Sequence, residues 1–163
     1  MNNAVAAGLE DRCEFLTNTD IKADVIVSFD AFEHFDDPAA TLEIMHDLLK
    51  PGGCVIVRFG PTWYHPLGGH LFSVFPWAHL VFSEAALIRW RSTIRSDGAT
   101  RFREVSGGLN QITIARFEHV VAASKFKIDE LETVPIRPLR SLHFRLTREF
   151  TTAVVRAKLV AKR

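Results

Sequence analysis

The chain has 163 residues, which is enough to bury one hydrophobic core, so a single domain is expected. Hydrophobic residues make up 47% and charged residues 24%, a globular composition that argues against disorder. The net charge of +1 gives no bulk electrostatic argument for nucleic-acid binding. The segment 137–163 is locally basic, which we interpret as a solvated face, with an acidic substrate or a membrane surface as the alternatives.

The cysteines and the N-terminus favour a cytoplasmic protein. Cys13 and Cys54 are the only cysteines, and two of them form neither a disulfide framework nor a zinc site. The start Met1-Asn2-Asn3 has neither the basic region nor the apolar region of a signal peptide, so none is expected. The longest apolar run, between Leu71 and Phe82, is interrupted and too short to span a bilayer, so no transmembrane segment is expected.

The first half of the chain reads as alternating strands and helices. Residues 1–10 are predicted to end a helix, and 13–19 to form a short strand. The run 24–28 is apolar throughout, as a buried parallel strand requires. The sequence then predicts a helix over 38–49, capped by Asp36 or Asp37, and a strand over 54–59. Two strands around a helix form a right-handed βαβ unit.

The second half begins with an irregular segment, 60–82, that is dense in aromatic residues and histidines. Ser83 is expected to begin a helix that ends near Trp90, and Thr113 to cap a helix that ends at Ser124. The segments 127–134 and 153–160 are predicted to be the last two strands.

Two motifs carry a resemblance to a known family. The first is Asp24-Val25-Ile26-Val27-Ser28-Phe29-Asp30-Ala31-Phe32-Glu33-His34-Phe35-Asp36-Asp37-Pro38, and the second is Leu48-Leu49-Lys50-Pro51-Gly52-Gly53. At this distance from each other they resemble class I S-adenosylmethionine-dependent methyltransferases of the small-molecule, type 11-like kind. The resemblance covers residues 1–59 closely and 111–163 loosely.

The resemblance implies an α/β fold: a Rossmann-like methyltransferase fold with three αβα layers. The family sheet has the strand order 3-2-1-4-5-7-6, with strand 7 antiparallel. On that map 13–19 is strand 3, 24–28 is strand 4 and 54–59 is strand 5, and the last two predicted strands are 6 and 7. Strands 1 and 2 and the glycine loop of the cofactor site have no counterpart. We therefore expect a partial methyltransferase domain over 1–163, truncated to strands 3–7, with an aromatic lid insertion over 60–110 after strand 5.

One turn departs from the family pattern. Ser124-Lys125-Phe126 replaces the usual Ala-Gly-Phe. A lysine in a left-handed cap costs about 1 kcal/mol relative to glycine, so a different turn is expected.

The resemblance also suggests cofactor-binding residues. Asp20 and the backbone of Ile21 would contact the adenine, although a loop aspartate that caps a turn is the alternative for Asp20. Ser28 and Phe29 lie at the carboxyl end of a strand, where ligands gather in such sheets, so they would contact the cofactor. The alternative is that they only pack at the end of the strand. His34 would line the cofactor or substrate cavity, or be held by its local turn. Glu33 is interpreted as ordering the loop.

The aromatic segment supplies the predicted substrate-binding residues, which are Trp63, Tyr64, His65, His70 and Trp77. Such a lid would exclude water and hold an apolar or aromatic acceptor. His65 and His70 are the candidate catalytic bases near neutral pH. The alternative is that the segment forms a small satellite core in which the histidines only have their hydrogen bonds satisfied. No metal site is predicted, because the spacing of His70 and His79 does not form a helical pair and a third ligand is absent.

The expected function is methyl transfer from S-adenosylmethionine, the expected cofactor, to a small-molecule or lipid-like acceptor in the cytoplasm. The alternative is a non-catalytic fragment or pseudoenzyme that serves as a binding or interaction module. An α/β hydrolase is disfavoured because no Gly-x-Ser-x-Gly elbow occurs. No nucleic-acid partner is expected, whereas peripheral membrane contact is compatible with the sequence. The acceptor, its reacting atom and the oligomeric state are left open.

Overall fold

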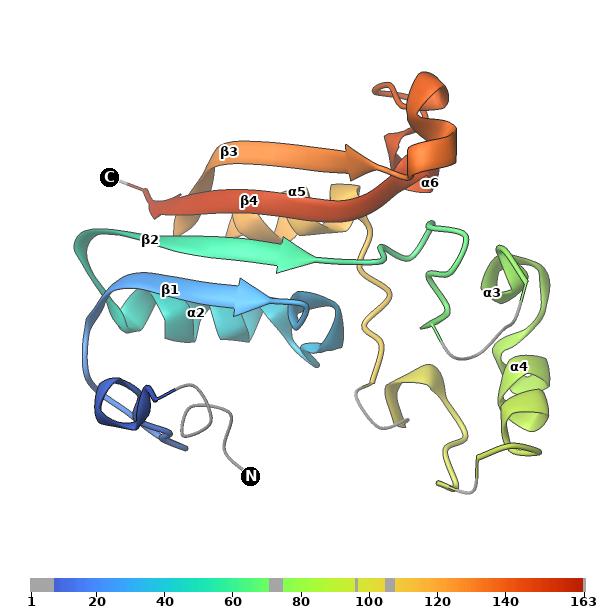
Figure 1. Ribbon diagram of the computed structural model, residues 1–163, viewed down its shortest axis with the longest axis horizontal. Helices are drawn as coiled ribbons and strands as arrows, with labels where there is room; N and C mark the ends of the chain where they lie inside the picture. Colours follow the sequence, from blue (N-terminus) through green and yellow to red (C-terminus); the bar gives the residue numbers. More distant parts are fainter. Residues whose placement is uncertain (1–7, 71–74, 96, 105–107, 163) are drawn as a thin grey trace.

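The computed structural model describes residues 8–70, 75–95, 97–104 and 108–162 (Figure 1). Its centre is a four-stranded sheet in the order β1-β2-β4-β3. The elements in chain order are η1 Glu10–Arg12, β1 Ala23–Phe29, η2 Phe32–His34, α2 Pro38–Asp47, β2 Leu49–Phe59, α3 Ala78–Val81, α4 Glu84–Arg91, η4 Phe102–Glu104, α5 Ile114–Ala123, β3 Phe126–Pro135, η5 Arg137–Leu142, α6 Arg148–Thr151 and β4 Thr152–Ala161.

The order and the directions of the strands match those expected for strands 4, 5, 7 and 6 of the family sheet. β1 and β2 run parallel, with Val27 opposite Ile56. β4 is antiparallel to β2 and to β3, so β3 runs in the same direction as β1 and β2. The carboxyl ends of β1, β2 and β3 therefore lie at one edge of the sheet, to the right in Figure 1. The predicted α/β methyltransferase-like fold is confirmed on this half of the sheet.

The helices α2 and α5 pack against one face of the sheet (Figure 1). Leu42 and Met45 of α2, and Phe117 and Val121 of α5, join a single core with the inward side chains of the strands. Each helix begins where the sequence predicts: the Asp37 carboxylate caps α2 ahead of Pro38, and the Thr113 hydroxyl caps α5. Successive side chains of a strand point to opposite faces of the sheet. The residues between those that pack on α2 and α5 therefore point to the other face.

The opposite face of the sheet is open among the described residues. Val25, Val27 and Phe29 of β1 project from it and remain 52%, 55% and 55% exposed. The described part of the chain thus shows two of the three expected layers, and the helices α2 and α5 form the one that covers the sheet.

The segment after β2 folds as a separate small unit that contains α3, α4 and η4. Ala78, Leu87, Phe102 and Leu109 form its own buried cluster, against which Trp63 packs. Gly68 allows the chain to turn closely here, because a Cβ atom at this position would lie 2.2 Å from the Trp63 carbonyl oxygen. Ser83 caps α4 as predicted. Phe72 belongs to the predicted lid and lies outside the described residues. No described helix is both long and apolar enough to cross a membrane.

Residues 13–19 do not form the strand that the sequence predicts, and this prediction is corrected. Residues 13–20 are exposed throughout and have no strand geometry. The physical reason is the lack of a ladder partner, because the only strand that the described residues pair with β1 is β2. Of the helix predicted over 1–10, residues 1–7 lie outside the described residues, and Glu10–Arg12 is a short 3-10 turn.

The start of one strand also differs from the prediction, whereas one expected turn is observed. β2 begins at Leu49, before the Pro51-Gly52-Gly53 turn, because Leu49 already pairs with Ala23 of β1. The turn after α5 differs from a left-handed cap, as expected: Ser124 is extended, and its hydroxyl accepts a hydrogen bond from the Phe126 N–H.

Candidate active site at the carboxyl ends of β1 and β2

The loop that follows β1 is anchored by an aromatic residue in the core. The Phe32 side chain is fully buried, and its ring centroid lies 5.4 Å from that of Phe59 and 5.1 Å from that of Phe117. Asp30 leaves the strand with a φ of 50° and pairs with Arg58 at 3.3 Å. These contacts hold η2 against the carboxyl ends of β1 and β2, where ligands bind in open α/β sheets.

Glu33 is carried into the interior by this packing and is only 4% exposed. Its Oε1 accepts a hydrogen bond from the Gly60 N–H at 3.3 Å. Its Oε2 is buried without a hydrogen-bond partner among the described residues. Burial raises the pKa of the Glu33 carboxyl above its ordinary value, partly offset by backbone hydrogen bonds.

Asn110 fixes the same loop from far along the sequence. Its side-chain amide donates to the carbonyl oxygens of Phe32 at 2.8 Å and Phe35 at 2.9 Å. Its backbone N–H donates to the Glu33 carbonyl oxygen at 3.0 Å. The loop of Glu33 is thus tied on both sides to the segment that leads into α5.

His34 and His70 come together beside Glu33. The His34 Nδ1 lies 2.6 Å from the Gly108 carbonyl oxygen, and the two imidazole rings meet edge to face at 5.5 Å. The His70 Nε2 is buried without a partner among the described residues. Burial, and secondly the nearby His34, lower the pKa of His70 below its ordinary value, so its imidazole is neutral at pH 7.

Glu33 and His70 line one small cavity of about 10 Å³. A cavity of this size holds roughly one water molecule or one hydroxyl group. Two residues that each carry a polar atom unpartnered among the described residues therefore line a space sized for one polar group. The other lining residues are Pro61, Trp63, Gly68, Leu109, Gln111 and Ile112.

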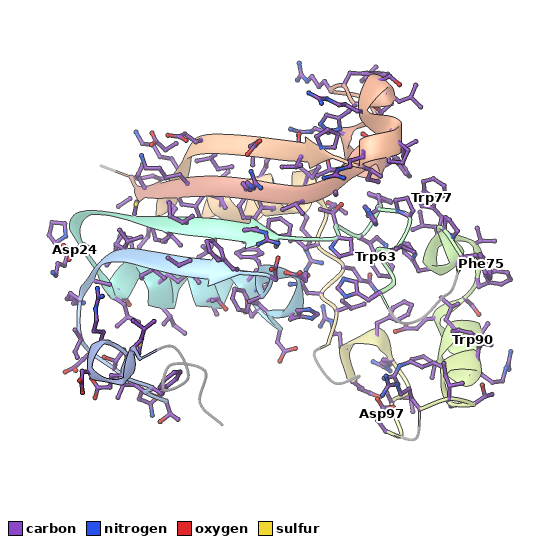
Figure 2. All side chains as sticks on the ribbon, in the orientation of Figure 1. Asp24, Trp63, Phe75, Trp77, Trp90 and Asp97 are labelled. Carbon is purple, nitrogen blue, oxygen red and sulfur yellow. The ribbon has the colours of Figure 1, made fainter. Side chains whose placement is uncertain are left out.

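Most of the other predicted lid residues contact one another instead of this cavity. The Trp63 ring meets those of His79 at 4.7 Å and Phe102 at 5.4 Å edge to face, and Trp63 also lines the cavity. The Trp77 indole N–H donates to the Tyr64 carbonyl oxygen at 3.0 Å. Figure 2 shows Trp63 between the sheet edge and the lid, with Trp77 farther out.

His65 and Tyr64 also lie away from the cavity. The His65 Nδ1 accepts a hydrogen bond from the Leu67 N–H at 2.9 Å, which occupies that nitrogen. The Tyr64 ring lies 5.1 Å from the ring of Phe150 in α6. Of the five predicted substrate residues, the structure brings His70 and Trp63 to the cavity and leaves the other three in the surrounding lid.

The residues predicted to hold S-adenosylmethionine do not converge. Asp20 and Ile21 precede β1, at the end marked by Asp24 in Figure 2, and Ile21 is 65% exposed. Ser28 and Phe29 lie at the carboxyl end of β1. They face opposite sides of the sheet: Ser28 is buried with an unpartnered Oγ among the described residues, and Phe29 is exposed.

The described residues therefore do not fit the whole cofactor. The Ser28 Oγ, which is unpartnered among the described residues, and His34 in η2 offer polar contacts at the carboxyl end of β1 only. Asp20 and Ile21 lie at the other end, so no described arrangement of these residues encloses both ends of such a molecule.

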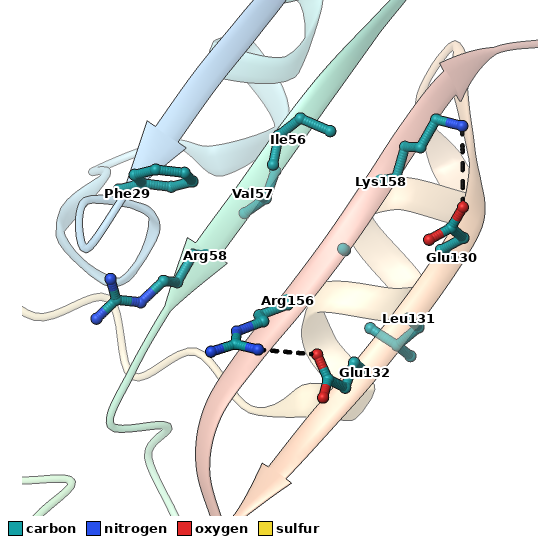
Figure 3. Close-up of a pocket in the computed structure, with 10 residues that line it drawn as sticks. Phe29, Ile56, Val57, Arg58, Glu130, Leu131, Glu132, Arg156 and Lys158 are labelled. Carbon is teal, nitrogen blue, oxygen red and sulfur yellow. Dashed lines mark hydrogen bonds and ion pairs between the residues drawn. The ribbon is translucent and has the colours of Figure 1, made fainter.

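A larger, open hollow of about 540 Å³ lies on the uncovered face of the sheet (Figure 3). Phe29 forms one wall, and apolar and charged side chains of β2, β3 and β4 form the rest. These charges are largely paired with one another: Arg156 bonds to Glu132 at 3.2 Å, and Lys158 lies 3.9 Å from Glu130. Because its polar groups satisfy each other, this hollow offers less chemistry than the small cavity at Glu33 and His70.

Sequence reasoning did not find Asn110 or Gly108 as parts of the site. Gly108 is 74 residues away from the histidine that it contacts, and no local motif links the two. The Glu33-His34 pair is evident in the sequence, but only the fold shows that Glu33 is buried with one oxygen unpartnered among the described residues. Among the described residues, no group of three or more His, Cys, Asp or Glu side chains is placed to hold a metal ion.

A mixed α/β sheet with this strand order, and a polar site at the carboxyl ends of its parallel strands, is the architecture of Rossmann-like methyltransferases. The family model for the methyltransferase domain matches residues 3–112, and the chain belongs to that family. No curated protein matches the chain.

Two solved structures are similar to the chain. One is a chain from the complex of the Haloferax volcanii Trm112 methyltransferase activator with a methyltransferase, at 16% identity and a TM-score of 0.49. The match covers 91% of this chain and 58% of that one, so the chain spans little more than half of its length. The other is a protein from Bacillus halodurans C-125 described as a methyltransferase, at 10% identity and a TM-score of 0.43, covering 96% and 74%.

Proposed function

We propose that this chain takes part in methyl transfer from S-adenosylmethionine to a small-molecule or lipid-like acceptor in the cytoplasm, and that its described residues supply the acceptor side of the site. Membership of the methyltransferase-domain family supports the reaction class. When bound, S-adenosylmethionine supplies an activated methyl group, so the protein has to orient the acceptor, exclude water and remove a proton where needed.

The observation that carries this proposal is the pair of unpartnered atoms at the small cavity. Both the Glu33 Oε2 and the His70 Nε2 are buried without partners among the described residues, and both residues line the same space. A buried polar atom without a partner costs roughly 1–3 kcal/mol, which a ligand group that hydrogen-bonds to it recovers. An acceptor hydroxyl would suit the pair, because its O–H can donate to the His70 Nε2 while its oxygen accepts a hydrogen bond from the Glu33 carboxyl in its protonated form, which burial favours.

His70 is then the better candidate for the general base. Its pKa is lowered by burial, so the ring is neutral and able to accept a proton at pH 7. His65 has a lowered pKa as well, but its Nδ1 is occupied by the Leu67 N–H and it does not line the cavity. The proton would leave the acceptor oxygen for the His70 Nε2, and Trp63 would shield that transfer from water.

The alternative function, a non-catalytic binding module, is favoured by one observation. The predicted cofactor contacts divide between the two ends of β1, with Asp20 before the strand and Ser28 near its end. A chain that keeps the acceptor pocket without enclosing the cofactor would bind a hydroxyl compound and not methylate it.

Labelled methyl transfer separates these two functions. The chain is incubated with S-adenosylmethionine labelled on the methyl group and a panel of phenols, long-chain alcohols and amines, and the extracted products are counted. We expect label in the hydroxyl compounds. A chain that binds a panel member, measured by calorimetry, and transfers no label to it would be the binding module instead.

A further inference from the structure

The segment 137–146, which follows β3, exposes large apolar side chains. Leu142 is 55% exposed, Phe144 52% and Leu146 86%. Three such side chains within five residues concentrate exposed apolar area in one short stretch, and large exposed apolar patches usually mark a contact site. The segment lies outside residues 3–112, where the chain matches the methyltransferase-domain family.

This exposure does not come from a loose loop, because the polar side chains of the segment are used to hold its shape. The His143 ring bridges a hydroxyl of β3 and a hydroxyl of α6, with its Nε2 3.0 Å from the Thr133 Oγ1 and its Nδ1 2.8 Å from the Thr151 Oγ1. The Thr147 hydroxyl donates to the Leu142 carbonyl oxygen. The His143 and Thr147 side chains therefore face the protein, whereas Leu142, Phe144 and Leu146 are exposed.

Arginines alternate with these apolar side chains. Arg137, Arg140 and Arg145 are exposed, and residues 136–147 contain no acidic residue. None of the ion pairs between described residues includes these three arginines. The surface is thus both apolar and positively charged, and a nucleic-acid partner would account for the charge but not for the leucines.

We propose that the segment 137–146 docks on anionic phospholipid membranes. Leu142, Phe144 and Leu146 would enter the interface, while the three arginines contact the headgroup phosphates. A bilayer surface is the partner that matches an alternation of exposed arginine and large apolar side chains, since its headgroups are anionic and its acyl boundary is apolar.

The position of the segment adds a consequence for the site. β3 runs in the same direction as β1 and β2, so the segment that follows it lies at the sheet edge that also carries Glu33 and His70 (Figure 1). Tyr64 of the lid touches Phe150 of α6, just beyond the segment, with ring centroids 5.1 Å apart. Docking would bring this edge to the bilayer. The proposed docking of segment 137–146 on membranes does not depend on the proposed methyl transfer.

Vesicle co-sedimentation of the full chain tests the proposal. We expect binding to equimolar phosphatidylcholine–phosphatidylglycerol vesicles, weakened by salt, and little binding to phosphatidylcholine alone. At about 1 kcal/mol for each basic residue near the surface, the triple variant R137A/R140A/R145A should lower the partition coefficient by about 100-fold. Leu146→Ser should lower it about tenfold through lost apolar burial, and its high exposure makes misfolding a poor explanation.

Matched variants on the lid control for net charge and for apolar content. Arg95, Arg101 and Arg103 are exposed, and Ile94 is 65% exposed. R95A/R101A/R103A and Ile94→Ser should leave vesicle binding within about twofold of the unmodified chain, given that the charge effect is local. Equal losses from both arginine triples, or equal binding to neutral vesicles, would overturn the proposal. So would a loss of self-association in Leu146→Ser without any change in vesicle binding, because a second copy would then cover the surface.

Discussion

Burial sets the protonation of the lid histidines. His65, His70 and His79 all have a pKa lowered from the ordinary histidine value of 6.5, chiefly because burial disfavours the charged ring. His79 also gives its Nε2 to the Trp63 carbonyl oxygen at 2.6 Å. Glu33 has the opposite shift, since burial raises its carboxyl pKa from 4.5. Burial in the lid and at the cavity therefore disfavours charge on all four side chains.

These shifts predict how the stability of the fold depends on pH. Below 6.5 the unfolded chain binds protons at His65, His70 and His79 that the folded chain does not, so stability is full above 6.5 and falls as the pH decreases. Glu33 acts in the opposite direction: its contribution is present below 4.5 and is lost as the pH rises through its raised pKa.

Urea unfolding above and below 6.5 measures this dependence. His70→Gln should flatten the decrease on the acidic side, whereas the same change at the exposed His119 should not. An identical pH dependence in the unmodified chain and in His70→Gln would show that the protonation of His70 is not coupled to folding.

At the scale of elements, α5 is held at its start by a residue far along the chain. The Glu149 carboxylate of α6 accepts hydrogen bonds from the Ile114 N–H at 3.0 Å and the Ala115 N–H at 2.8 Å. These donors lack partners within the helix, and a negative group at a helix N-terminus is favoured by the helix dipole. Glu149 thereby fastens α6 to the helix that covers the core.

Removing this carboxylate should destabilise the fold. Glu149→Ala leaves two helix N–H groups without their acceptor, at an expected cost of about 1–3 kcal/mol in the free energy of unfolding. Glu132→Ala is the matched control, because it removes an exposed carboxylate whose pair with Arg156 should contribute about 0–1 kcal/mol. Chemical denaturation followed by circular dichroism compares them, and equal losses would contradict the role of Glu149.

The lid unit has a structural role and a proposed functional role. Substitutions of its aromatic residues distinguish the two. Trp63→Ala, at the cavity, should raise the acceptor's Michaelis constant by about ten- to 100-fold through lost apolar contact, with unchanged affinity for S-adenosylmethionine, whereas Trp77→Ala and Tyr64→Ala should raise it less because these residues do not line the cavity. Trp63→Ala should in addition open the small core of the lid to limited proteolysis, since Trp63 packs on His79 and Phe102. If all three variants unfold the lid and the folded fraction keeps normal acceptor kinetics, the segment is structural only.

Elements with strong local signals were predictable from the sequence. The Asp37-Pro38 start of α2, the Thr113 cap of α5 and the apolar runs of β1 and β4 gave types and positions within two or three residues. The strand predicted over 13–19 was wrong because a strand depends on a neighbour that sequence periodicity does not reveal. The candidate site was only partly predictable for the same reason: its residues are joined by contacts such as that of His34 with Gly108.

At the scale of the whole molecule, the uncovered face of the sheet is the feature that should govern self-association. Val25, Val27 and Phe29 project from β1, which is an edge strand of the described sheet. Exposed apolar side chains on an edge strand favour pairing with another chain. We predict concentration-dependent self-association in sedimentation velocity.

Charge at the centre of this face should reverse the self-association. Val27→Lys places a solvated cation on the edge strand, while Ile44→Lys makes the same change on the outer side of α2, where Ile44 is 60% exposed. The first variant should be more monomeric and the second should behave as the unmodified chain. A monodisperse monomer of the unmodified chain at all concentrations would contradict this prediction.

The central claim is that the cavity of Glu33 and His70 receives the acceptor and that His70 removes its proton. The most direct measurement is the rate of labelled methyl transfer by His70→Gln compared with His65→Gln, a matched change at the neighbouring lid histidine that does not line the cavity. Loss of a general base lowers turnover by about 100- to 10,000-fold, so His70→Gln should fall by this much while His65→Gln stays within about threefold of the unmodified chain. Equal rates in the two variants, or a greater loss in His65→Gln, would contradict the account.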